Sequence, residues 1–160
     1  VQAHGDDLYR RSMYTFWKRQ SPPPSMLIFD APSREVCTAR RARTNTPLQA
    51  LALMNDPQFV EAARMLAERM MKEAGPDPLE RMSYAFQLAT ARKPAGEECT
   101  VLVDTFAAQL KTYRDKPDAA LELLSVGEAK RDESLDAAEL AAYTTIASMI
   151  LYLDEAVSKG

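Results

Sequence analysis

The sequence predicts a mainly α-helical protein: an irregular helical bundle with a less regular N-terminal segment that can include a short hairpin. Three observations support this fold class. From Thr46 onward, apolar residues recur at the three- and four-residue spacing of one helix face. Pro follows Thr, Asp or Lys where several of these stretches begin, and Pro suits the first helical position. The same region is rich in Ala, Leu, Met and Glu, which favour helices.

Three helices are expected in the first half of this region. Thr46-Pro47 begins a short helix that ends near Asn55, and Asp56-Pro57 begins a second one that ends near Gly75. Asp77-Pro78 begins a third, which ends at Arg92-Lys93-Pro94. The second helix has one clear apolar face, formed by Phe59, Ala63, Leu66 and Met70.

The second half predicts three more helices. One runs from about Gly96 to Arg114, and a shorter one runs from Pro117 to Gly127. A charged, exposed loop at 128–134 follows, and Asp136 can cap the last helix, with Glu139 completing a capping box. This last helix extends to Leu153 and is apolar on nearly every face, which is typical of a central helix. The buried residues expected across the bundle are Phe59, Leu66, Met82, Phe86, Leu102, Phe106, Ile146 and Ile150.

The N-terminal segment is less regular. The spacing over residues 9–19 fits a strand and a helix equally well. Ser21-Pro22-Pro23-Pro24 predicts an extended connector, and 26–29 is a short apolar run that suits a strand. The pattern of 35–44 favours neither helix nor strand.

Charge divides the chain into two parts. Residues 1–44 carry eight basic and four acidic side chains, a net +4, whereas 45–160 carry 12 and 19, a net −7. We therefore interpret residues 1–160 as one domain fragment in which a basic, aromatic segment, 1–44, packs on a helical bundle, 45–160. The overall net charge of −3 is too small to indicate nucleic acid as a partner. The longest apolar stretch, 141–153, is too short for membrane insertion.

Few residues suggest chemistry. The single histidine, His4, and two isolated cysteines cannot form a c-type haem motif or a zinc site, so we expect no cofactor, no metal and no catalytic residue in this chain. There is no Gly-x-Ser-x-Gly motif to present a nucleophilic serine. Cys37 and Cys99 could form a disulfide in an exported protein, although a free, buried Cys99 is the commoner arrangement.

One cluster stands out as a candidate site for binding or for structural ion pairs. Its members are basic or aromatic: Tyr14, Trp17, Lys18, Arg19, Arg34, Arg40 and Arg41. Such a cluster can bind an anionic glycan, or its arginines can pair with acids of the helical region. The net +4 beside a net −7 favours the structural interpretation.

Several motifs in order resemble a known family. They include Tyr14-Thr15-Phe16-Trp17-Lys18-Arg19, Phe29-Asp30-Ala31-Pro32, Thr44-Asn45-Thr46-Pro47-Leu48-Gln49-Ala50-Leu51 and Asn55-Asp56-Pro57. Together they resemble the C-terminal domain of large secreted proteins of planctomycetes and verrucomicrobia. The pattern from Leu135 to Glu155 is similar to the end of that domain.

In that family a cytochrome c-like domain typically comes first and the domain resembled here comes last. The resemblance implies that this chain is the C-terminal part of its domain, that the protein is extracytoplasmic, and that haem is carried elsewhere in the protein. It implies no reaction. We therefore expect a non-catalytic helical module that scaffolds or docks to sibling cytochrome-like domains. The alternative is part of a polysaccharide-acting enzyme, or an anionic-glycan-binding module, with key residues partly upstream.

Overall fold

A computed structural model describes residues 4–9, 12–18, 20–33, 35–40, 44 and 46–157. The chain forms two compact units, Val1–Asn55 and Asp56–Gly160, which we describe separately as unit 1 and unit 2. Every regular element among the described residues is a helix, and no strand forms among them. The prediction of a mainly α-helical fold is therefore confirmed. The unit boundary follows Asn55, so the helix that begins at Pro47 belongs with the N-terminal segment. How the basic segment packs on the bundle stays a prediction.

Unit 1 contains only short elements. Two 3₁₀ helices, η1 (Gly5–Tyr9) and η2 (Ser12–Tyr14), precede α1 (Pro24–Ile28) and α2 (Pro47–Asn55). The strand expected at 26–29 is wrong, and no hairpin forms among the described residues. The reason is local: Pro24 occupies the first position of α1, where a missing N–H group is tolerated, so the proline run starts a helix.

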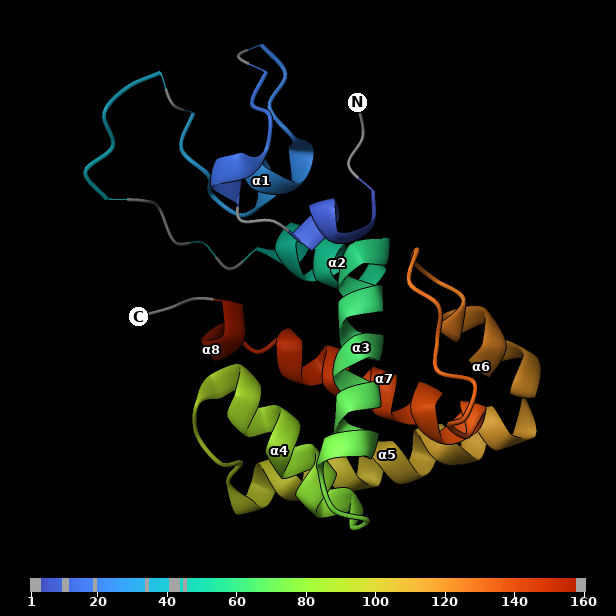
Figure 1. The fold of residues 1–160 in the computed structure, drawn as a ribbon. Coiled ribbons are helices and arrows are strands. Elements are labelled where there is room, and N and C mark those ends of the chain that lie inside the picture. The colour runs from blue at the N-terminus through green and yellow to red at the C-terminus, as the bar shows by residue number, and fades with distance from the viewer. Residues whose placement is uncertain are drawn as a thin grey trace. The chain divides into compact units, whose positions relative to one another are not determined.

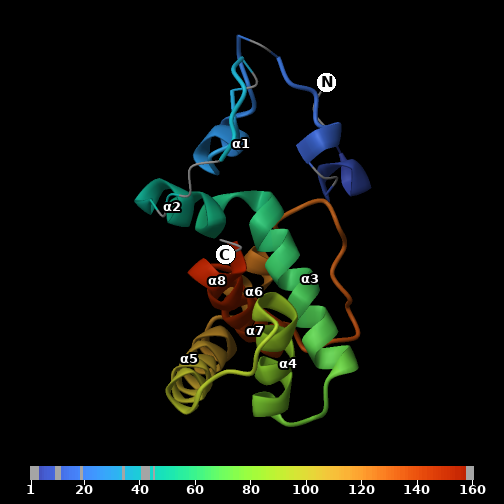
Figure 2. The same ribbon diagram turned by 90° about the vertical axis from the view of Figure 1, so that its left-hand side faces the viewer.

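Unit 2 contains the helical bundle (Figures 1 and 2). Its helices are α3 (Pro57–Glu73), α4 (Pro78–Thr90), α5 (Gly96–Asp115), α6 (Pro117–Leu124), α7 (Ala137–Leu151) and α8 (Asp154–Val157). The expected helix bounds agree closely for α3 to α7. Helix α8 is not predicted by the sequence, because it is a single short turn and has no apolar periodicity to reveal it.

The predicted caps at three helix starts are confirmed. The carboxylate of Asp56 accepts a hydrogen bond from the Gln58 backbone N–H at 2.9 Å, and Asp77 and Asp136 cap α4 and α7 in the same way. Glu139, the expected partner in a capping box, instead pairs with Arg81 at 2.7 Å. The N-terminus of α7 is therefore fixed both by its own cap and by α4.

The core of unit 2 forms around α7. Helices α3, α4, α5 and α6 all pack on it, and Figure 2 shows α7 between α3 and α5. Six of the eight predicted core residues are buried, whereas Phe59 and Leu66 are half-buried. On the inward face of α3, Ala63 and Met70 are fully buried as predicted and Ala67 joins them, so the apolar stripe is rotated away from Phe59 and Leu66.

A buried tyrosine joins three helices at the centre of this core. The ring of Tyr143 on α7 stacks on Phe106 of α5, with 4.4 Å between ring centroids. The guanidinium of Arg81 on α4 lies 5.4 Å from the Tyr143 ring centroid, and its Nη1 is 3.5 Å from the hydroxyl oxygen. Burial raises the pKa of Tyr143 above its usual range, so the hydroxyl stays protonated near neutral pH.

Truncating Phe106 to Ala should lower the free energy of unfolding by about 3–5 kcal/mol, through lost burial and the cavity left against Tyr143. Urea denaturation measures this change. The matched control is Val103→Ala, on the same helix but exposed, which should cost less than about 0.5 kcal/mol. Equal losses in the two variants would show that the inward face of α5 is assigned incorrectly.

Candidate functional site

In unit 1, a polar hub centred on Gln49 connects three separate stretches of chain. The Gln49 side-chain amide donates hydrogen bonds to the Ile28 carbonyl oxygen at 2.8 Å and to Thr44 Oγ1 at 3.1 Å. Its Oε1 accepts from the Thr46 backbone N–H at 2.9 Å, while the Gln49 N–H donates to Thr46 Oγ1 at 3.2 Å. Gln49 and Thr46 therefore form the capping box of α2, and the same glutamine ties α2 to the end of α1.

Asp30 completes the hub. Its carboxylate accepts hydrogen bonds from the Thr44 backbone N–H and from Thr44 Oγ1, both at 2.8 Å. Both bonds lower the pKa of Asp30 below its usual range, and the bond from the Thr44 hydroxyl has the larger effect. The Asp30 side chain is therefore ionised at neutral pH. Asp30 has a φ of 56°, a left-handed conformation that Asp tolerates better than most residues.

Neither Asp30 nor Gln49 is among the candidate site residues predicted from the sequence. Both lie inside the motifs that carry the family resemblance, but their hydrogen bonds join residues far apart in the sequence. The Gln49 amide, for example, donates to the Ile28 carbonyl oxygen and to Asp30. One local signal was available, because Thr46-x-x-Gln49 has the spacing of a capping box. The polar hub thus consists of Asp30, Thr44, Thr46 and Gln49. We regard it as the feature that orders unit 1.

Four of the seven residues in the predicted basic and aromatic cluster are described: Tyr14, Trp17, Lys18 and Arg40. Tyr14, Lys18 and Arg40 are exposed, and Trp17 is half-buried. No ion pair joins Lys18 or Arg40 to another residue in the described part of the chain. The remaining members lie outside the described residues: Arg19, Arg34 and Arg41.

Unit 1 also exposes large apolar side chains. Phe16 is 83% exposed, Met13 72% and Tyr14 69%. On α2, Leu48, Leu51 and Met54 are more than half exposed, and residues three apart share one side of a helix. Clusters of exposed apolar residues on a folded unit commonly mark interaction surfaces.

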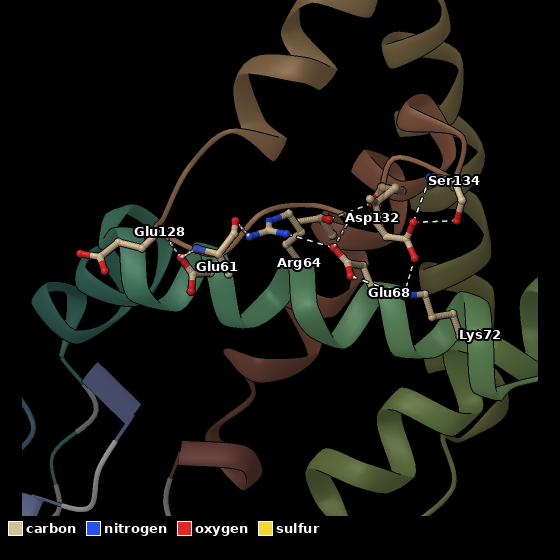
Figure 3. A network of polar contacts seen from close by, with 10 residues as sticks. Glu61, Arg64, Glu68, Lys72, Glu128, Asp132 and Ser134 are labelled. Carbon is tan, nitrogen blue, oxygen red and sulfur yellow. Dashed lines mark hydrogen bonds and ion pairs between the residues drawn. The ribbon is translucent and has the colours of Figure 1, made fainter. Parts of the chain in front are cut away.

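In unit 2, a network of buried charges follows one side of α3 and holds the loop at 127–134 (Figure 3). The carboxylate of Glu61 accepts hydrogen bonds from the backbone N–H groups of Glu128 and Ala129, the latter at 3.1 Å. Gly127, just before them, has a φ of 97°, and a Cβ there would overlap the Glu61 carboxylate and lie 2.7 Å from Glu61 Cβ. The loop can therefore close over Glu61 only with glycine at this position.

Arg64 and Glu68 continue the network along the same face of α3. Arg64 is fully buried; its Nη1 donates to Glu68 at 3.0 Å and its Nη2 to the Ala129 carbonyl oxygen at 2.7 Å. Its Nε has no hydrogen-bond partner among the described residues. Lys72 Nζ lies 2.6 Å from Asp132 in the loop, and this bond holds the pKa of Asp132 well below its usual range.

The side chains of this network already bind one another or the loop backbone, so the arrangement is structural. The sequence predicts a charged, exposed loop at 128–134 and does not predict buried acids on α3. The side chains at 128–130 are indeed exposed, but the loop backbone is held by Glu61, Arg64 and Glu68. These charges are buried only because the loop covers them. The loop is distant in sequence, so the local pattern of α3 does not reveal their burial.

The described residues do not assemble a recognisable reaction centre. No group of three or more His, Cys, Asp or Glu side chains among them could hold a metal ion. Cys37 is exposed in unit 1 and Cys99 is half-buried in unit 2, and both are free thiols. No described helix is long and apolar enough to cross a membrane. The expectations of no cofactor and no metal stay predictions.

These features define an all-α protein in which unit 1 is organised by a polar hub and unit 2 by a central apolar helix. Residues 1–106 match the family PSD1, described as "Protein of unknown function (DUF1553)", and since this is more than half of the chain, the chain belongs to that family. Comparisons with curated proteins and with solved structures gave no match. The match spans unit 1 and ends within α5, so the resemblance at 135–155 stays a prediction.

Replacing Gln49 with Ala should loosen unit 1 and leave unit 2 intact. The change removes four side-chain hydrogen bonds, each worth about 1 kcal/mol, so amide exchange at Thr44 and Thr46 should quicken at least about tenfold. Hydrogen exchange read by NMR measures these rates. Gln87→Ala, exposed on α4, is the control and should leave them unchanged. Unchanged exchange in Gln49→Ala would contradict the role of the hub.

Proposed function

We propose that this chain is a non-catalytic helical module of a multidomain extracytoplasmic protein, and that it docks through unit 1 to a cytochrome c-like domain of the same protein. The observation that carries this proposal is the exposure of large apolar side chains on unit 1, above all Phe16 at 83%. Exposed aromatic side chains commonly supply the energetic centre of an interface. The partner and the location come from the family resemblance.

Two further features support docking. The hub fixes the backbone around α1 and α2, so the side chains of Leu48 and Leu51 are presented from an ordered helix and lose little freedom on binding. Residues 1–44 carry a net +4, which would steer unit 1 toward an acidic face on the partner.

The buried charges of unit 2 favour a non-catalytic role. Glu61, Arg64 and Glu68 are engaged by the loop at 127–134, so their hydrogen-bonding capacity is directed inward. The single histidine of the chain, His4, is exposed in unit 1. A general base beside an activated nucleophile, which covalent catalysis needs, is not formed by the described residues.

Titration of the chain with the separately purified cytochrome c-like domain tests the proposal. Wild-type chain should bind, and Phe16→Gln should weaken binding at least about tenfold, since truncated aromatic hot spots commonly cost more than about 1.4 kcal/mol. Isothermal titration calorimetry measures both affinities. The control is Leu121→Gln, an exposed apolar residue on α6, which should leave the affinity unchanged. Absence of binding by the wild-type chain, or equal binding by Phe16→Gln, would contradict docking through unit 1.

A second function, binding of an anionic polysaccharide, is favoured by one specific observation. Lys18, Arg40 and Tyr14 of the predicted cluster are all exposed, and no ion pair among the described residues engages Lys18 or Arg40. Free basic groups and aromatic rings are the side chains that recognise sulfated or carboxylated sugars.

Dextran sulfate and neutral dextran distinguish this function from docking. If the polysaccharide is the ligand, the chain should bind dextran sulfate only, and the double variant Lys18→Ala, Arg40→Ala should lose most of that binding. Because exposed charges are screened, added salt should weaken it too. Lys111→Ala, Arg114→Ala removes the same charge from the exposed surface of α5 and is the control. Equal losses in the two double variants would indicate only a nonspecific charge effect.

A further inference from the structure

An apolar pocket of about 310 Å³ lies within unit 2, between α4, the first turns of α5 and the end of α7. Its floor is formed by the buried side chains of Phe86, Leu102 and Ile150, and Val101 and Met149 contribute to its walls. This volume is at the lower end of the range for ligand pockets, about 300–1,000 Å³, so it suits a small molecule with an aliphatic body.

The mouth of the pocket is acidic. Glu97 and Glu98, in the first turn of α5, both line it. Arg92 binds Glu98 at 2.7 Å and Glu155 at 2.6 Å, and its guanidinium lies over Phe86, 4.7 Å from the ring centroid. Arg92 is shared between Glu98, which lines the pocket, and Glu155, which does not, so these three side chains together carry one net negative charge. These contacts hold the pKa of Glu98 at about 2, so that carboxylate is ionised over the whole physiological range.

Arg92 has no hydrogen left to offer an anionic ligand. Its Nε donates to Glu155, its Nη1 to Glu98 and to the Lys93 carbonyl oxygen, and its Nη2 to both carboxylates. These five bonds account for all five guanidinium hydrogens. An anion at the mouth would therefore meet carboxylates and no free arginine donor.

Glu97 supplies a second uncompensated charge. It is exposed, lines the pocket and makes no ion pair with another described residue, and the exposed Lys93 does not line the pocket. The N-terminus of α5 would by itself favour an anion, but two acidic side chains in its first turn offset that dipole.

We propose that this pocket binds a small aliphatic ammonium ion. The alkyl chain lies on the apolar floor at Phe86, Leu102 and Ile150, and the ammonium group meets the carboxylate of Glu97. Charge complementarity selects a cation, the floor selects an aliphatic body, and the volume limits its size. This site is separate from the docking proposed for unit 1 and does not depend on it.

Calorimetric titration with n-hexylammonium, n-hexanol and n-hexanoate tests the proposed selectivity. We expect hexylammonium to bind more tightly than hexanol and hexanoate to show no binding. Glu97→Gln should weaken hexylammonium binding about three- to fivefold, the effect of one exposed ion pair, and leave hexanol binding unchanged. Glu122→Gln, an exposed acid on α6, is the charge-matched control and should change neither.

Methyl NMR of the same chain locates the ligand. Hexylammonium should shift the methyl signals of Met149 and Ile150, which line the pocket, and leave that of Met65, exposed on α3, in place. Binding of hexanoate as tight as that of hexylammonium would overturn the charge selection. Shifts confined to other methyl groups, or no binding of hexylammonium at millimolar concentration, would overturn the site itself.

Discussion

Burial of α7, which has no exposed residue, is the constraint on which unit 2 depends. This helix is apolar on nearly every side, so α3, α4, α5 and α6 must cover it together. Its one large polar group in the core, the Tyr143 hydroxyl, requires a partner there. Arg81 provides it and also binds Glu139 at 2.7 Å and the Gly75 carbonyl oxygen at 3.0 Å. A single arginine thus joins α4 to the N-terminal half of α7 and to the turn after α3.

Helix α3 has two buried sides of opposite character, and this arrangement determines the path of the loop at 127–134. One side places Ala63, Ala67 and Met70 against the core, and the other buries Glu61 and Arg64. Buried charges are costly unless hydrogen bonds compensate them. The backbone of the loop supplies those bonds, and it can approach because Gly127 has no side chain and accepts a φ of 97°. The loop is therefore part of the fold of α3, although its own sequence resembles a solvated connection.

The parts of the fold that could be predicted from sequence depend on local chemistry. Asp56-Pro57 and Asp77-Pro78 place a cap and a proline within two residues, so the starts of α3 and α4 were evident. The buried charges were not, because a charged helix stripe looks the same whether water or a loop from far along the chain covers it. The candidate cluster is predicted from a local concentration of basic and aromatic residues, and this criterion selects arginines. The ordering role in unit 1 belongs instead to the uncharged Gln49, whose contacts with Ile28 and Thr44 only the folded chain shows.

The two units are ordered by different kinds of interaction, and this difference bears on function. Unit 2 is ordered by an apolar core of many buried side chains. Among the described residues of unit 1 only Gln49 and Leu53 are buried, and the hub orders the backbone through polar contacts. Hydrogen bonds can hold a backbone in one conformation without burying apolar side chains. Leu48 and Leu51 are therefore both ordered, through the capping box of α2, and available. A surface that is already ordered loses less entropy when a partner covers it, so a few exposed apolar contacts suffice for specific docking.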